Sequence, residues 1–179
     1  MRIVSSKRRR KVLAQIALVL VVLFLLATAR LFLWPPSNSP TPANAVVSLS
    51  GPWQHQANAA FELAHQGFTR IVVVSLGNNN RDLCPPAPPR IQVICFRPNP
   101  VDTRGEAEFV ARLAARRHWR KIIVVPERSQ TTRARLLFER CTGINMEFVP
   151  VQDPSSRLPF DLLYQWAALM KALVLKPSC

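Results

Sequence analysis

The chain is poor in glycine and histidine, and each shortage excludes a class of site. Its five glycines form neither a glycine-rich phosphate loop nor the dinucleotide-binding fingerprint. Its three histidines are scattered and no Cys-x-x-Cys pair occurs, so we expect no metal site and no bound cofactor. No nucleophile elbow is present, and the spacing of Ser50, His55 and Asp102 gives no support to a catalytic triad.

Acidic residues are also few, with ten against 24 lysines and arginines, giving a formal net charge of +14. Much of the surplus lies in residues 1–11, which we expect to form a basic cytoplasmic tail. Residues 12–34 are apolar over a length that can cross a hydrocarbon core, and they predict a transmembrane helix. The alternative is a signal peptide cut after residues 27–29. Apolar residues continue past that site to Trp34, which favours an uncleaved anchor.

The anchor predicts a single-pass protein of the cytoplasmic membrane, with residues 45–179 as an extracytoplasmic domain. Beyond Arg30, seventeen basic residues stand against the ten acids. Such a field attracts anionic surfaces, so we expect anionic envelope components or a small phosphate-bearing ligand as partners. The surplus is equally consistent with a solvated arginine-rich surface. Export, and the lack of aromatics among the basic stretches, argue against nucleic acid.

Four cysteines in an exported domain predict disulfides, although four thiols allow three pairings. Cys84 and Cys95 flank one loop and are the first expected pair. Cys141 with Cys179 would complete the set.

Residues 35–44, with prolines among small polar residues, are typical of a short stiff linker. Beyond them, apolar runs without alternation predict strands covered on both faces, and helical stripes lie between the runs. An aromatic-basic-aliphatic entry occurs at residues 68–74 and again at 119–125, which favours βαβ winding. We therefore expect a Rossmann-like three-layer α/β sandwich with a mostly parallel sheet of about five strands. The expected strands are 45–49, 71–74, 91–95, 122–125 and 146–149.

The last predicted helix places Leu162, Trp166, Leu169 and Leu173 on one side. This stripe predicts packing against the core. The alternative is docking onto the bilayer beside the anchor.

In a sheet wound in this way, ligands bind at the carboxyl ends of the strands. Polar turns follow four of the predicted strands there, and Arg133, in the opening turn of a helix, could hold a phosphate or carboxylate. Arg133 could equally be solvent-exposed or a partner for Glu106. The candidate ligand-binding residues are Ser50, Gly51, Asp102, Thr103, Arg104, Glu106, Gln130 and Arg133.

The stretch from Asp102 to Glu106 also has a purely structural interpretation. Thr103 and Glu106 have the spacing of a capping box, in which both side chains bond backbone N–H groups at a helix start. A helix N-terminus favours ionised acids, so we expect Asp102 and Glu106 to be better acceptors than proton donors. Ser129 is the expected cap of the following helix.

These segments together resemble the YdcF/SanA/ElyC-like proteins of bacterial envelopes. The resemblance rests on residues 46–51, the helix ending at Gly67, residues 102–107, and residues 122–125 followed by Arg133. It implies a Rossmann-like domain behind a membrane anchor and a role in peptidoglycan or envelope integrity. Asp102, Thr103, Glu106 and Arg133 match the family pattern.

Two positions depart from that pattern. Gln130 stands where the family usually has a histidine, and His55 and Gln56 stand where an arginine is usual. Loss of the histidine removes a group that titrates near neutrality, which favours binding without turnover. We therefore expect ligand binding in envelope or peptidoglycan biogenesis. The alternative is an envelope enzyme acting on a phosphate-bearing lipid-linked or nucleotide-like substrate, with Glu106 or Asp102 orienting a water or hydroxyl.

Overall fold

The computed structural model describes residues 3–51, 55–77, 84–153, 158–175 and 179. Five parallel strands form one sheet in the order β3-β2-β1-β4-β5. This confirms the predicted α/β class, with a sheet that is parallel throughout. The strands are β1 Ala45–Ser48, β2 Ile71–Ser75, β3 Gln92–Phe96, β4 Lys121–Val125 and β5 Asn145–Phe148, each within one or two residues of its predicted bounds.

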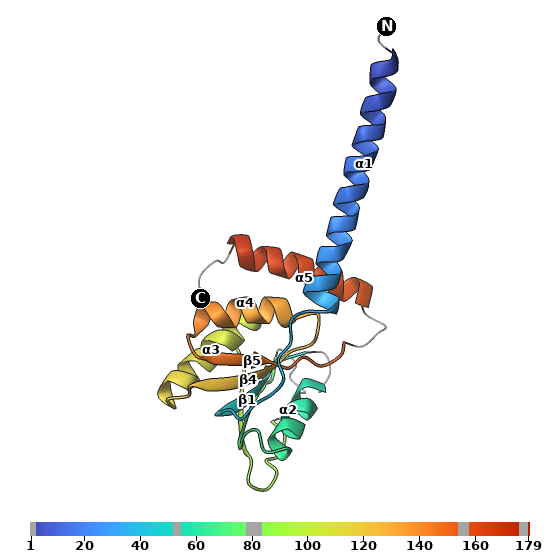
Figure 1. Ribbon diagram of the computed structural model, residues 1–179. Coiled ribbons are helices and arrows are strands. Elements are labelled where there is room, and N and C mark those ends of the chain that lie inside the picture. Colours follow the sequence, from blue (N-terminus) through green and yellow to red (C-terminus); the bar gives the residue numbers. More distant parts are fainter. Residues whose placement is uncertain (1–2, 52–54, 78–83, 154–157, 176–178) are drawn as a thin grey trace.

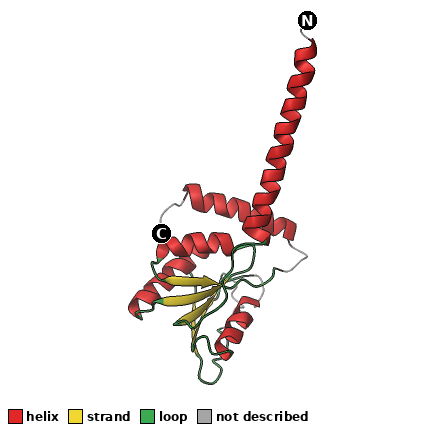
Figure 2. Cartoon of the chain, viewed as in Figure 1, coloured by secondary structure: helices red, strands yellow, loops and turns green. Residues whose placement is uncertain are grey.

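Helices cover both faces of the sheet (Figure 2). Helix α2, His55–His65, packs on one face through Ala60, Leu63 and Ala64. Helices α3, Thr103–Arg116, and α4, Thr131–Cys141, pack side by side on the other face. The inner strands β1, β2 and β4 are apolar with little alternation because both of their faces are buried, whereas the edge strands β3 and β5 are only partly buried. Since β1 runs between β2 and β4, the chain reverses direction across the sheet there, at the place where ligands bind in such folds.

An N-terminal helix, α1 Ile3–Thr28, continues into a π-helical turn, η1 Ala29–Leu33. It projects away from the domain (Figure 1). Its stretch Arg8–Leu33 is long and apolar enough to cross a membrane. Its first turns carry the predicted basic tail, of which residues 1–2 lie outside the described part of the chain.

The predicted linker is hydrogen-bonded to the domain along much of its length. The Asn38 side chain accepts a bond from the Phe148 N–H at the edge strand β5. Thr41 donates from both its N–H and its hydroxyl to Glu147, at 2.8 Å each. Asn44 accepts from the N–H groups at the start of β4. Helix α1 is thus joined to the domain by a fixed segment.

The two predicted disulfides, Cys84–Cys95 and Cys141–Cys179, are both present. The first ties the long connection between β2 and β3 to strand β3. The second joins the end of α4 to the last residue of the chain. Disulfides of this kind are typical of oxidising compartments.

The last helix, α5 Leu158–Met170, continues as η3 Lys171–Leu175. Helix α5 runs across the base of α1 and lies next to α4 (Figure 1). Leu169 is buried and Leu162 and Trp166 are half-buried, so most of the predicted stripe does pack inward. Leu173, at 45% exposure, does not.

Candidate functional site

The site begins at the start of α3, where the expected capping box does not form. The N-cap is Asp102, whose Oδ1 accepts a hydrogen bond from the Gly105 N–H at 3.0 Å. Glu106 turns away from the helix start, and its Oε1 accepts the Ser50 N–H at 2.7 Å instead. The Thr103 hydroxyl likewise bonds another element. The spacing of a capping box is therefore present without its hydrogen bonds: Glu106 points to the residue after β1, and Thr103 points to α4.

Position 105, in the first turn of α3, requires glycine. A Cβ on Gly105 would lie 1.9 Å from the carbonyl oxygen of Pro100, which is backbone and cannot move aside. This close approach brings the start of α3 against the turn that follows β3. The turn thereby fixes the direction in which Thr103 and Glu106 point.

Glu106 lies inside the domain, with 1% of its surface exposed. Burial raises the pKa of its carboxyl, because the charged form loses its hydration. The Ser50 N–H, the hydroxyls of Ser75 and Ser50, and the charge of Arg133 oppose this shift without reversing it. Our expectation that the helix start would favour the ionised form is therefore wrong for Glu106. Desolvation outweighs the helix terminus.

Arg133 is buried too, at 6% exposure. Its Nη1 donates to the Thr103 hydroxyl at 2.6 Å, and its Nε donates to Gln165 Oε1 at 3.1 Å. The described residues give the third nitrogen, Nη2, no hydrogen bond. The guanidinium also lies 5.9 Å from the centre of the Tyr164 ring. Threonine, glutamine and tyrosine therefore fix this guanidinium in one orientation.

Burial shifts the pKa of Arg133 toward the uncharged form, as it does for Glu106. Burial lowers the pKa of Arg133, and the nearby Tyr164, Glu106 and Asp102 oppose the change. Arg133 was expected to be a ligand contact, a solvent-exposed residue, or a partner of Glu106. The structure excludes the exposed alternative and places it within electrostatic reach of Glu106.

A pocket of about 220 Å³ opens beside this arginine. Its walls come from the start of α3, the inner side of α4, and α5 with η3. Three cationic side chains and one carboxylate lie on its walls, so its charge balance is positive. The lining residues are Asp102, Thr103, Arg104, Arg133, Leu137, Tyr164, Ala167, Ala168, Lys171 and Ala172.

The structure brings most, but not all, of the predicted site residues together. Four of them line the pocket: Asp102, Thr103, Arg104 and Arg133. Glu106 and Ser50 lie behind this wall, joined by their hydrogen bond.

Gly51 and Gln130 lie apart from the pocket lining. A Cβ on Gly51 would clash with Gln56 Nε2 and approach Glu127 Oε1, so Gly51 permits a close approach of α2 to the end of β1. Gln130 is the N-cap of α4, in place of the expected Ser129. Ser129 instead bonds Asp153 through both its N–H and its hydroxyl.

Sequence reasoning missed three residues of α5 and η3 that complete the site. Tyr164 and Lys171 line the pocket, and Gln165, 3% exposed, holds Arg133. A signal was available, because Gln165 and Lys171, with Asp161, are the polar interruptions of a mostly apolar helix. Gln56 is a further unexpected polar group: it is 1% exposed, and neither end of its amide has a hydrogen-bond partner among the described residues.

Comparisons with family models, curated proteins and solved structures found no match for this chain. Within the described residues, no group of three or more histidine, cysteine or acidic side chains is placed to hold a metal ion. The geometry of the site is therefore the basis for its function.

Proposed function

We propose that this protein is a membrane-anchored domain that binds a small phosphate-bearing anion in the pocket beside Arg133. One observation carries the proposal. A buried guanidinium, already oriented by Thr103 and Gln165, forms part of the wall of an open pocket. Arginine held in this way binds phosphate or carboxylate oxygens through directed charge-assisted bonds, and little ordering is left to be done when the ligand arrives.

The other charged groups of the pocket support an anionic ligand. Lys171 and Arg104 add positive charge to its wall, opposite a single carboxylate, Asp102. Arg104 is partly compensated by Glu108, which accepts from its Nε at 2.9 Å. Lys171 and Arg133 are therefore the main cations available to a ligand.

We further propose that the domain lies outside the cytoplasmic membrane and acts in envelope or peptidoglycan biogenesis, as its resemblance to YdcF/SanA/ElyC-like proteins implies. The apolar helix Arg8–Leu33, preceded by basic residues, supports this orientation. The two disulfides support an oxidising compartment.

Turnover is the second candidate, favoured by the raised pKa of Glu106, which is typical of acid–base residues. Binding without turnover fits better, because Glu106 lies behind the pocket wall and is not among the lining residues. Its carboxylate is bonded to the Ser50 N–H. Gln130, at the position of the family's histidine, is also absent from that lining.

The test is to titrate the full chain, in nanodiscs of neutral lipid, with inorganic pyrophosphate and to measure binding by calorimetry. We expect saturable binding that Lys171→Gln and Arg133→Gln each weaken by about tenfold or more, the effect of losing one charge-assisted contact. Mass spectrometry of small molecules retained by the purified protein would then identify the natural ligand.

Arg112→Gln is the matched control, because it removes the same charge from an exposed side chain on the outer face of α3. Lys171 is itself exposed, so its substitution leaves the buried network in place. If pyrophosphate does not bind, or if the Arg112 and Lys171 variants weaken binding equally, the pocket is not an anion site.

A further inference from the structure

Helix α5 and η3 expose an apolar face that no described residue covers. The opposite face is buried through Gln165, Leu169 and Ala172. One lysine, Lys171, interrupts the exposed face. Its large side chains are Phe160, 80% exposed, Leu163, 73%, Val174, 65%, Tyr164, 62%, and Met170, 50%.

The position of α5 along the anchor is fixed by Trp166. Its ring stacks on Phe24 and meets Phe32 edge-on, each at 5.3 Å between ring centres, and its Nε1 donates to the Thr28 hydroxyl at 3.1 Å. These three partners lie in the last turns of the apolar helix. Phe24 is nine residues before Leu33, or about 14 Å along a helix, so α5 meets the anchor near one end of its span.

The base of the anchor is also fixed to the domain itself. Phe32 is fully buried, and the Thr132 hydroxyl at the start of α4 donates to the Leu31 carbonyl. Domain, anchor and α5 therefore keep one relative orientation.

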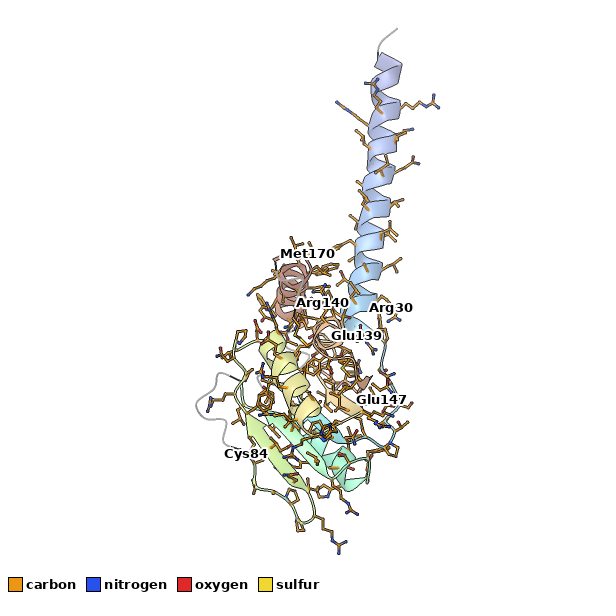
Figure 3. The ribbon with its side chains drawn as sticks, turned by 90° about the vertical axis from the view of Figure 1, so that its left-hand side faces the viewer. Arg30, Cys84, Glu139, Arg140, Glu147 and Met170 are labelled. Carbon is orange, nitrogen blue, oxygen red and sulfur yellow. A yellow bond between two sulfur atoms is a disulfide. The ribbon has the colours of Figure 1, made fainter. Side chains whose placement is uncertain are left out.

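In that orientation the apolar face of α5 lies on the side toward which α1 extends. Figure 1 shows α5 running across the base of α1, with the sheet on the far side. In Figure 3, Met170 lies at the top of α5, on the side toward which α1 extends, whereas Glu147 and Cys84 lie lower in the domain. Helix α1 exposes further apolar side chains, such as Leu20 and Leu23, on the N-terminal side of its contact with Trp166.

We propose that α5 is an interfacial helix, docked by this face onto the lipid bilayer that α1 spans. A bilayer is the occupant that suits the geometry, because the exposed face belongs to a helix that packs through Trp166 on the end of the membrane-length helix α1. An amphipathic helix at this depth buries its apolar side chains about 5 to 10 Å into the boundary between headgroups and acyl chains. Tyr164 and Lys171 lie at the edge of the face, where tyrosine rings and lysine amines reach the headgroups. The proposal does not depend on what the pocket binds.

The experiment places a photo-reactive benzoylphenylalanine at Leu163 in the full chain, reconstituted into phosphatidylcholine nanodiscs. Leu20, within the anchor, is the positive control, and the exposed Arg112 on α3 is the negative control. After irradiation, lipid adducts are measured by mass spectrometry. We expect a lipid adduct at Leu163 with a yield comparable to that at Leu20, and no adduct at Arg112.

Adducts at Leu20 without adducts at either Leu163 or Val174, which is exposed on the same face, would overturn the proposal. A cross-linked dimer through Leu163 would overturn it as well, by showing that the face pairs two copies of the chain. Repeating the measurement at Val174, one further turn beyond Met170 on the same face, guards against a local effect of the substitution. Lipid adducts are expected there too, and their absence at both positions contradicts docking.

Discussion

Two glutamates, one on helix α3 and one on the edge strand β5, lie in opposite electrostatic environments. Glu106, beside the carboxyl end of β1, is 1% exposed, and burial raises its pKa. Glu147, on the edge strand β5, is half-buried. Burial alone would raise the pKa of Glu147 as well, but its bonds to Lys121 and Thr41 outweigh burial and lower it. Lys121 Nζ lies 2.7 Å from its Oε1. Burial makes the charge of Glu106 unfavourable, whereas the charge of Glu147 stabilises the fold through its bonds to Lys121 and Thr41.

The difference in environment indicates different roles for Glu147 and Glu106. A pair of charges near the surface contributes modestly to stability and fixes the linker to the domain, which is a sufficient role for Glu147. Glu106 and Arg133 lose hydration that their mutual attraction does not fully restore, as both pKa directions show. Groups kept in such an environment are characteristic of functional sites.

The largest expected effect is that of Arg133→Ala. It would leave Glu106 without its nearby positive charge and would remove the donors to Thr103 and Gln165. Removing this buried charge and leaving its two acceptors unpaired costs about 3 kcal/mol of stability. Chemical denaturation of the full chain in micelles measures it, with Arg112→Ala, expected within about 0.5 kcal/mol of wild type, as control. Equal effects of the two variants would contradict the buried network.

A smaller effect, on the order of 1 kcal/mol, is expected for Glu106→Gln, and it concerns pH. Because the folded protein holds the Glu106 proton more tightly than the unfolded chain, wild type should lose stability as pH rises from about 4.5 through the raised pKa. The glutamine variant keeps an acceptor for the Ser50 N–H and should lack this loss. Melting temperatures of both proteins between pH 4 and 8 measure the difference. A gap that widens toward low pH would contradict the assigned environment.

The smallest effect is expected for Glu147→Gln, about 0 to 1 kcal/mol at neutral pH. The stability that Glu147 contributes changes with pH in the opposite direction to that of Glu106. The lowered pKa of Glu147 gives stability that is present above about pH 4.5 and is lost as pH falls through the folded pKa, so the variant should approach wild type in acid. The same melting series, extended below pH 4, checks this. If the two glutamate variants follow parallel pH curves, the contrast between the two regions is wrong.

Much of the fold could be predicted from the sequence, because its signals are local. The continuous apolar runs predicted the buried parallel strands, and the loop between Cys84 and Cys95 predicted their disulfide. The order of the strands could not be predicted, since it depends on contacts between segments far apart in the chain.

The candidate site was predicted only in part, for the same reason. The winding of the sheet predicted that Ser50, Thr103, Glu106 and Arg133 would converge, and they do. The directions of the Thr103 and Glu106 side chains were not predicted, because a capping box has identical spacing. Lys171 was not predicted, because its place in the pocket depends on where α5 crosses the domain.

The fixed linker sets the reach of the protein. The bonds of Asn38, Thr41 and Asn44, with the anchor's own contacts, leave no slack between the apolar helix and the sheet. With α1 spanning a membrane and the pocket binding an anion, as proposed above, the pocket would stay at a constant height above the bilayer. Its ligands would then be limited to molecules that travel in that layer or diffuse up to it. Lengthening the linker would not extend its range while those bonds persist.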